Sequence, residues 1–518
     1  MPMSGTDALF RWLAQRGVAT VFGTFDPGLP DTLRLQRART GRGAALMSEG
    51  AARASGAPAV ALVRADGESF DALAVLAQAR TDSVPLLLLS LQTDTGLLDL
   101  TPLSRPLTAV SRRVERLADL PAALNDAWRA FGEGRARPTH LVLPRAVLEA
   151  CHDAHSDDPN PATATDSATA GAIAATTAAT AEPTASATGR TPSDRDIEAA
   201  AQLLRTTPLR PVMIIGRGAL GAGQDLVAIA EMTGALVVSS VAGKGIVPDD
   251  HPQSLGAAVG RDELQNRIDK ADVLLVVGSA LDPVDTGRNS IAFSGDFIRI
   301  DHDPALMRSG GHPDIELVGD ATATIARLRK AIGTGGIADR QWVFYISKVI
   351  RDDIDSRLTP IERQHAHLIN LIQHHAPEGT VWSTDACELA ANAALTLPTR
   401  SPGHFLHPNG LGVTGTAIPA AMGVRGAFPE ASVAVLTDND GLFAAVQELP
   451  VAGAQGHALP IIVWENDAAY DIDLVAEACG CAVERPASSF ALEGTVADAF
   501  KADRPWLILL GGDTPWLG

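Results

Sequence analysis

The chain has 518 residues, of which 46% are hydrophobic and 20% charged, and its formal net charge is −19. This length exceeds what one hydrophobic core supports and predicts about three domains. The negative charge excludes a nucleic-acid-binding surface, which needs a basic face, and disfavours docking on anionic membranes. No apolar run reaches the roughly 18 residues that a membrane span requires. The N-terminus is typical of an amphipathic helix rather than a signal peptide. We therefore expect a cytoplasmic protein.

The first expected domain covers residues 1–150. It contains four near-continuous apolar runs, at 18–23, 59–63, 85–91 and 139–144, with helical patterns between them. Such runs are typical of strands buried on both faces, so they indicate a parallel sheet covered by helices on both sides.

Residues 151–192 differ in composition from the rest of the chain. The segment consists almost entirely of Ala, Thr, Ser, Asp and Pro, with one Ile and no aromatic residue. It cannot bury enough apolar surface to offset its chain entropy. We therefore expect a disordered linker between the first domain and the rest of the chain.

The same strand–helix alternation returns twice after the linker, in a central domain (193–335) and a third domain (342–518). The expected strands are 211–216, 235–240, 273–278, 297–301, 380–384, 433–437, 460–465 and 506–510. The predicted fold class is α/β, with three tandem doubly wound parallel-sheet domains, the central one Rossmann-like.

A glycine motif, Gly216-Arg217-Gly218-Ala219-Leu220-Gly221, follows the first central strand and satisfies the dinucleotide fingerprint literally. A functional fingerprint needs an acidic residue at the end of the next strand, to hold the ribose hydroxyls. That strand ends in Val238-Ser239-Ser240. The motif therefore favours a tight structural turn over an NAD site. An FAD elsewhere across this domain stays possible, without support from the sequence.

The third domain carries the most informative pattern. Glycine-rich sequence at 410–415 precedes a helix of small residues, and two later strands end in 438–441 and 465–467. Carboxylate and amide oxygens at two adjacent strand ends can hold a hard cation such as Mg²⁺. The cation could bind a diphosphate, together with backbone amides at a helix N-terminus.

This pattern resembles the motif of the thiamine-diphosphate-dependent enzymes, a Gly-Asp-Gly followed after about two dozen residues by Asn-Asn. Here 24 residues separate Asn439-Asp440-Gly441 from Asn466-Asp467. The resemblance implies thiamine diphosphate and Mg²⁺ as cofactors. The implied metal ligands are Asp440, Asp467 and the backbone carbonyl of Ala469, and the implied cofactor contacts are Gly410, Gly412, Thr414, Gly441 and Asn466. If the register is set on Gln447-Glu448-Leu449 instead, Asp438-Asn439-Asp440 takes the Gly-Asp-Gly position.

The resemblance extends over nearly the whole chain. Within the family, the chain is most similar to the acetolactate synthases and the 5-guanidino-2-oxopentanoate decarboxylases. It rests on GVATVFGT (17–24), ARTDSVPLLLLS (79–90), GKGIVPDDHP (243–252), KADVLLVVGSAL (270–281) and IRIDHDP (298–304). It implies a pyrimidine-binding first domain and a diphosphate-binding third domain. Since the family binds its cofactor between two subunits, it also implies a homodimer or homotetramer.

The catalytic glutamate of the family, which contacts the cofactor's pyrimidine ring, has two possible positions. One register places Glu49 there, because Ser48-Glu49-Gly50 resembles His-Glu-x. A gapless register over 39–56 places Thr40-Gly41 in the His-Glu position instead. We favour the second register, under which Gly41 stands where the carboxylate would be.

Further departures affect the same region. Asp66-Gly67-Glu68 and Asp71 correspond to the family's Gly-Pro-Gly loop and following Asn, and the segment after Asp467 is short. Two hypotheses follow. The chain is either a thiamine-diphosphate- and Mg²⁺-dependent enzyme that decarboxylates or carboligates a small 2-oxo acid, or a catalytically degenerate paralogue serving as a partner subunit.

Overall fold

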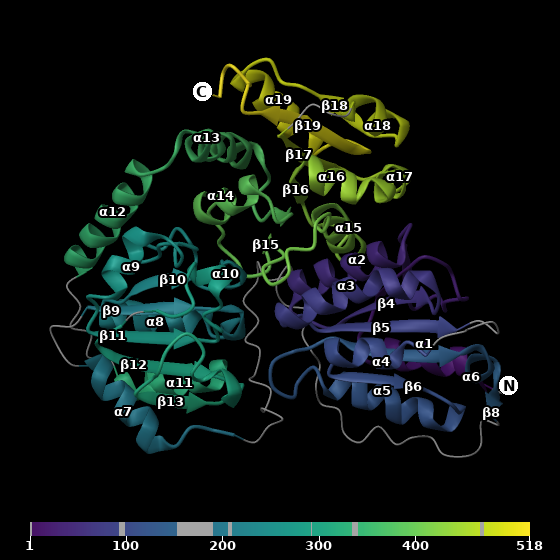
Figure 1. Cartoon of the computed structure of the whole chain (residues 1–518), viewed down its shortest axis with the longest axis horizontal. Helices are drawn as coiled ribbons and strands as arrows, with labels where there is room; N and C mark the ends of the chain where they lie inside the picture. Colours follow the sequence, from purple (N-terminus) through teal and green to yellow (C-terminus); the bar gives the residue numbers. More distant parts are fainter. Residues whose placement is uncertain are drawn as a thin grey trace.

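The computed structural model describes residues 3–92, 99–152, 190–205, 210–291, 293–333, 340–466 and 471–517. It contains three parallel sheets, each covered by helices on both faces (Figure 1). The predicted fold class is therefore confirmed. Most of the expected linker, residues 153–189, lies outside the described residues. The domain boundaries stay predictions.

The N-terminal sheet has six strands, in the order β3-β2-β4-β5-β7-β6. Two hydrophobic cores, one on each face, bury it. The strands are β2 (Thr20–Gly23), β3 (Arg34–Arg37), β4 (Ala59–Arg64), β5 (Leu86–Gln92), β6 (Val110–Arg113) and β7 (Thr139–Pro144). The helices are α1 (Gly5–Gln15), α2 (Gly41–Ser55), α3 (Gly67–Thr81), α4 (Thr101–Ser104), α5 (Leu120–Arg129) and α6 (Arg145–Glu149). Outside this sheet, β1 (Met3–Ser4) pairs with β8 (Cys151–His152).

The central sheet has five strands, in the order β10-β9-β11-β12-β13. They are β9 (Pro211–Ile215), β10 (Leu236–Ser239), β11 (Val273–Val277), β12 (Asp296–Asp301) and β13 (Ile315–Val318). The helices of this part are α7 (Asp194–Arg205), α8 (Gly223–Thr233), α9 (Asp262–Ile268), α10 (Pro283–Thr286) and α11 (Ala321–Ile332).

The C-terminal sheet has six strands, in the order β15-β14-β16-β17-β19-β18. They are β14 (Val381–Thr384), β15 (Phe405–Leu406), β16 (Val433–Asp438), β17 (Leu459–Glu465), β18 (Ala482–Glu484) and β19 (Pro505–Gly511). The helices are α12 (Arg340–Ser356), α13 (Pro360–His375), α14 (Glu388–Thr396), α15 (Ala417–Ala427), α16 (Asn439–Ala444), α17 (Leu449–Ala454), α18 (Ile472–Ala478) and α19 (Ser489–Ala499). Helix α12 joins this domain to the central one and packs Val343, Ile350 and Ile354 into the central core.

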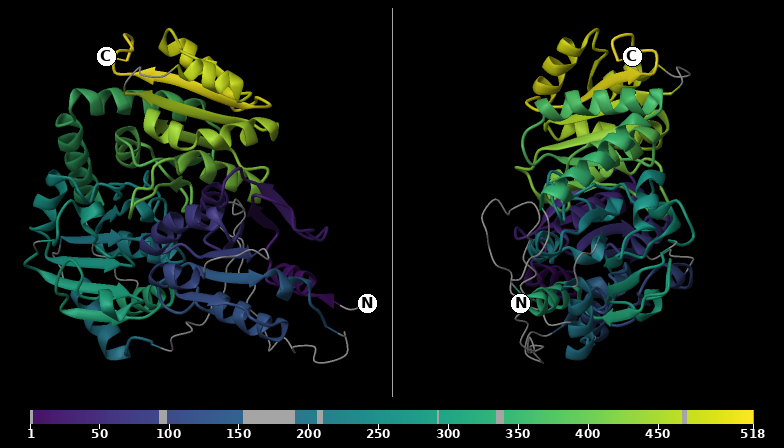
Figure 2. Two further views of the ribbon diagram at one scale, coloured as in Figure 1. Left: turned by 45° about the vertical axis from the view of Figure 1, so that its right-hand side comes forward. Right: turned by 90° about the vertical axis from the view of Figure 1, so that its left-hand side faces the viewer.

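The N-terminal and central domains lie side by side, and the C-terminal domain lies across one end of both (Figures 1 and 2). Within the described residues, no helix combines the length and the apolar character that crossing a membrane would require.

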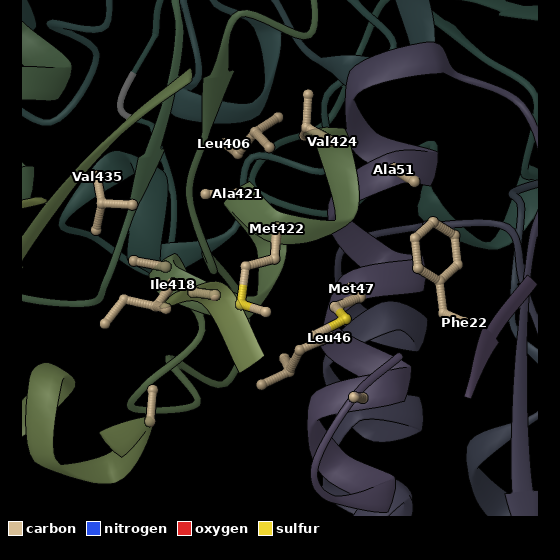
Figure 3. Close-up of a cluster of buried hydrophobic side chains, with 14 of the residues drawn as sticks. Phe22, Leu46, Met47, Ala51, Leu406, Ile418, Ala421, Met422, Val424 and Val435 are labelled. Carbon is tan, nitrogen blue, oxygen red and sulfur yellow. The ribbon is translucent and has the colours of Figure 1, made fainter. Parts of the chain in front are cut away.

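Helices α2 and α15 join the N-terminal and C-terminal domains through one shared core. Figure 3 shows Met47 of α2 beside Met422 of α15, with Ile418 on the same helix. Two glycines allow this close approach. A Cβ at Gly50 would lie 2.6 Å from Ala420 Cα, and one at Gly423 would lie 2.6 Å from Met47 Cα. The small residues of both helices therefore set how closely the two domains pack.

Candidate functional site

The carboxyl ends of β16 and β17 meet at one edge of the C-terminal sheet, as the sequence predicts. Asp438 pairs in register with Trp464, so the residues after each strand are neighbours. Asp438 accepts hydrogen bonds from Gly441 N at 2.9 Å and from Asn466 Nδ2 at 3.2 Å. Both carboxylate oxygens of Asp438 are thus engaged by the protein itself.

A second carboxylate, Asp385, follows the neighbouring strand β14. It accepts hydrogen bonds from Thr416 N at 2.6 Å, Ala417 N at 3.2 Å and Thr437 Oγ1 at 2.7 Å. Burial raises the pKa of this carboxyl above its ordinary value. The amides that begin α15 are therefore already bound to an acidic side chain. Sequence reasoning missed Asp385, although its position after a strand is the same signal that identified Asp438.

The glycine segment forms an open turn before α15. Gly412 and Gly415 have φ of +58° and +77°, a region that other residues adopt only with strain. Gly410 N donates to Asp82 Oδ1 at 2.7 Å. Thr414 is exposed, and its carbonyl accepts a short hydrogen bond from Arg42.

The remaining predicted site residues in this domain are only partly described by the structure. Asp440 and Asn466 are exposed, whereas Gly441 is buried, and a Cβ at Gly441 would lie 2.8 Å from Asp385 Cγ. Asp467 and Ala469 lie outside the described residues. Among the residues that are described, no group of three or more His, Cys, Asp or Glu side chains is arranged to hold a metal ion.

Gly41 is the first residue of α2, behind the N-cap Thr40. A Cβ at Gly41 would lie 2.8 Å from Glu68 Cα and closer still to the Glu68 carbonyl. The backbone at the start of α3 therefore fills the space that a side chain at Gly41 would need.

The acidic residues that start α3 bind local partners. The carboxylate of Glu68 accepts hydrogen bonds from Thr24 Oγ1 at 2.6 Å and from Arg64 N at 3.0 Å, and it pairs with Arg64 Nη1 at 2.8 Å. Asp66 caps α3 by accepting a bond from Glu68 N, and Asp71 is exposed.

Glu448, from the C-terminal domain, lies against the start of α2. It is buried and accepts hydrogen bonds from Arg39 N at 2.8 Å, Thr40 N at 3.1 Å and Thr40 Oγ1 at 2.8 Å. A Cβ at Gly43 would lie 2.5 Å from Glu448 Cδ. Burial raises the pKa of Glu448. Its three donors make it an interdomain helix cap, a contact between distant segments that the sequence does not reveal.

Glu49, the other candidate for the catalytic carboxylate, lies in the buried middle of α2. It pairs with Arg53 Nη2 at 2.6 Å and accepts a hydrogen bond from Gln78 Nε2 at 2.8 Å. Burial raises the pKa of Glu49, against the opposing charge of Arg53. Arg53 also pairs closely with Asp82.

This buried network holds the glycine segment of the C-terminal domain. Asp82 accepts hydrogen bonds from Asn409 N at 3.1 Å and from Gly410 N, while Gln78 Oε1 accepts one from Val413 N at 2.9 Å. Arg53 Nη1 donates to the His407 carbonyl at 3.1 Å. Glu49 therefore belongs to a hydrogen-bonded network that joins the N-terminal domain to residues 407–413 of the C-terminal domain.

The glycine motif of the central domain is a tight turn. A Cβ at Gly216 would lie 2.5 Å from Ser279 Cα, and one at Gly218 would lie 2.8 Å from Gly278 Cα. Close approach of two backbones thus accounts for these two glycines. This agrees with the structural interpretation of the motif, and FAD gains no support from it.

Comparison with protein-family models matches all three domains in order. The N-terminal TPP binding domain of thiamine pyrophosphate enzymes matches residues 3–111, the central domain matches 197–328, and the C-terminal TPP binding domain matches 385–471. The chain belongs to the thiamine pyrophosphate (thiamine diphosphate) enzyme family. The predicted family membership is confirmed.

Curated relatives of this family resemble the chain over most of its length. A probable 2-ketoarginine decarboxylase of Pseudomonas aeruginosa is 29% identical over 543 residues, covering 96% of this chain and 92% of the relative. An acetolactate synthase of Mycobacterium bovis is 26% identical, covering 90% and 76%. The large subunit of acetolactate synthase isozyme 3 of Escherichia coli is 28% identical, covering 89% and 81%.

A solved structure shares the fold over the full chain. It is described as a candidate thiamin diphosphate-dependent enzyme from Mycobacterium smegmatis and aligns with a TM-score of 0.76 at 18% identity, covering 99% of both chains. At this identity the likeness concerns the fold alone.

The described residues differ from the family's site at the start of α2 and at two helix ends of the C-terminal domain. Gly41 provides no carboxylate. The amides of Thr416 and Ala417 at the start of α15 bind Asp385, and the amide of Gly441 in α16 binds Asp438. A diphosphate placed at these helix ends would lie near two carboxylates and would need a cation between it and them.

Proposed function

We propose that this chain is a catalytically degenerate member of the thiamine pyrophosphate enzyme family, which serves as a partner subunit and binds the cofactor weakly or not at all. The observation that carries this proposal is Gly41, whose Cβ position is blocked by the backbone of Glu68. We further propose that it assembles as a homodimer or homotetramer, since the family builds its site between subunits.

Glu448, which lies against the start of α2, and Glu49, in its middle, do not replace the missing carboxylate. The family's carboxylate acts by a hydrogen bond to the pyrimidine ring of the cofactor, so a replacement must reach that ring and be free to make this bond. Glu448 is held by three donors from Arg39 and Thr40, and Glu49 is held by Arg53 and Gln78. Both side chains are buried and engaged in domain contacts.

The test measures cofactor activation without a substrate. The protein is incubated with thiamine diphosphate and Mg²⁺ in D₂O, and exchange of the thiazolium C2 proton is followed by NMR after acid quenching. We expect the exchange rate of the free cofactor. Accelerated exchange would contradict the proposal, and the large subunit of acetolactate synthase isozyme 3 of Escherichia coli provides the positive control.

The second candidate is a thiamine-diphosphate- and Mg²⁺-dependent 2-oxo acid decarboxylase or acetolactate-synthase-type carboligase. This enzymatic function is favoured by the alignment with the probable 2-ketoarginine decarboxylase, which covers 96% of the chain. In this candidate Asp440, Asp467 and Ala469 hold the metal, and a small 2-oxo acid is the substrate. If exchange is accelerated, the variant Glu49→Gln decides the register, since an unchanged rate would remove Glu49 from the chemistry.

A further inference from the structure

A cavity of about 340 Å³ lies where the three domains meet. The N-terminal domain contributes the end of α3 and the loop before β7, the central domain contributes 282–285, and the C-terminal domain contributes Asn409 and Gly410. This volume falls within the range of small-molecule sites, which often form at domain interfaces.

The wall from the N-terminal domain is cationic. It presents Arg80, Arg135 and Arg137, all of them half-buried. Among the described residues, the side chains of Arg80 and Arg135 form no hydrogen bond and no ion pair, and Arg137 has one pair, with Asp303 at 3.8 Å. Burial, together with the charge of Arg137, lowers the pKa of Arg80. The charge of Arg135 also acts on the Asp301 carboxyl, whose pKa it lowers against the effect of burial. The three guanidinium groups are thus gathered with one long ion pair among them.

The wall from the central domain is anionic. It presents Asp282, which is exposed, and Asp285, whose Oδ1 is buried and has no hydrogen-bond partner. Burial raises the pKa of Asp285 to about 6. Across the described part of the chain, no ion pair joins these carboxylates to the three arginines. A third carboxylate, Asp82, is occupied by Arg53 and by two backbone amides.

Backbone strain coincides with the same place. Ser83 and Leu281 are the residues other than glycine with positive φ among those described, at 56° and 54°. Ser83 lines the cavity, and Leu281 directly precedes Asp282. Such conformations cost free energy and concentrate at ligand-binding and active sites. The strain therefore supports a site that has been shaped for a ligand.

We propose that this cavity binds a small zwitterionic molecule, with a carboxylate at one end and a guanidinium or ammonium group at the other. The carboxylate would pair with Arg80 and Arg135, which suit planar bidentate contacts. The cationic end would pair with Asp282 and Asp285. A ligand of this kind would pair with the arginines of one wall and the aspartates of the other, whereas a simple anion or cation would pair with one wall only. The proposal requires neither bound thiamine diphosphate nor turnover.

The test is a calorimetric titration at pH 8 with 5-guanidinopentanoate as the probe. Pentanoate and pentylguanidine, which each carry one of the two charges, are the comparison ligands. We expect the probe to bind at least about tenfold more tightly than either. Absence of binding at about 10 mM probe, or equal affinity for the probe and a single-ended ligand, would overturn the proposal.

Two variants separate the walls. Asp282→Asn, at an exposed position, should weaken the probe about tenfold and leave pentanoate unchanged. Arg135→Gln should weaken both the probe and pentanoate. Arg116→Gln, an exposed arginine outside the cavity, is the matched control and should change neither affinity. Unchanged probe affinity in both cavity variants would also overturn the proposal.

Discussion

Gly41 and Glu68 together determine what the start of α2 can do. In many proteins a glycine at the first position of a helix leaves room for any other residue. Here the carbonyl and Cα of Glu68 occupy that room. The single substitution Gly41→Glu would not place a carboxylate here without moving the backbone at Glu68, because that backbone fills the space beside Gly41.

Because of this contact, we expect a side chain at position 41 to destabilise the folded protein. Gly41→Ala should lower the free energy of unfolding by about 1–3 kcal/mol, since the added methyl group would overlap the Glu68 backbone. The matched control is Gly67→Ala, also at the first position of a helix, where a Cβ would meet nothing within 4 Å. Urea denaturation measures both. Equal stabilities of the two variants would contradict the close contact.

His140 is a second residue whose surroundings have a measurable consequence. Its ring is buried between Ser90 and Ser104, whose Oγ atoms lie 2.8 Å from Nε2 and 2.7 Å from Nδ1. Burial lowers the pKa of His140 to about 4. The folded state therefore keeps the ring neutral at pH values where the unfolded chain takes up a proton.

Stability should fall as the pH falls from about 6.5 to about 4, because only the unfolded state gains a proton in this window. The contribution of His140 is about 2 kcal/mol at pH 5. Urea denaturation at pH 7.5 and 5 should show a smaller loss for His140→Asn than for the parent protein. His457→Asn, at an exposed position, should lose as much as the parent. A loss in His140→Asn equal to that of the parent would contradict the assigned pKa.

At the scale of elements, the contact between α2 and α15 depends on glycines rather than on large apolar side chains. Gly50→Ala should destabilise the protein by about 1–3 kcal/mol, because the new methyl group would overlap Ala420 of α15. Gly494→Ala, within α19 and free of neighbours within 4 Å, should instead stabilise it by about 0.5–1 kcal/mol through helix propensity. Thermal unfolding of both variants checks the two signs. A stabilised Gly50→Ala variant would show that the helices do not touch as described.

All the strands that the sequence predicts are present in the structure. The strands that the sequence did not predict all escaped prediction for the same reason. Every apolar run that was expected to be a strand lies in one of the three parallel sheets. The missed members of these sheets, β3, β6, β13, β15 and β18, all lie at sheet edges. They are short, and most are only partly buried, so they lack the continuous hydrophobic run that identifies a central strand.

At the scale of the whole molecule, one buried ion network joins the N-terminal domain to the glycine segment of the C-terminal domain. Burial opposes the charge on Arg53, but Glu49 and Asp82 outweigh it and raise the pKa of Arg53. Arg53→Met should lower the free energy of unfolding by about 3–5 kcal/mol, because it removes the cation paired with two buried carboxylates. The more distant charge of Arg217 then still acts on them.

Two further variants make this prediction specific. Arg116→Met removes an exposed ion pair with Asp119 and should leave the free energy of unfolding nearly unchanged, because water screens the two charges. The triple variant Arg53→Met, Glu49→Gln, Asp82→Asn should recover part of the loss, since it removes both carboxylates together with the cation that paired with them. If the triple variant is as unstable as Arg53→Met alone, the lost stability comes from side-chain packing rather than from unpaired charge, which would contradict this prediction. Urea denaturation measures all three.

The candidate site was only partly predictable. Sequence motifs located the strand ends at Asp438 and Asn466 and the glycine turn, because these features are local. The Glu448 cap, the Arg53 network and the cavity at Arg80 and Asp285 join segments that are far apart in the chain. No periodicity or spacing encodes such contacts, since they arise when the domains pack.

We propose that this chain has kept the fold of its family and lost the cofactor chemistry. Calorimetric titration with thiamine diphosphate and Mg²⁺ tests it most directly. We expect no binding tighter than about 1 mM, both in the parent protein and in Asp440→Ala. Binding near 1 μM in the parent, abolished by Asp440→Ala, would contradict the account.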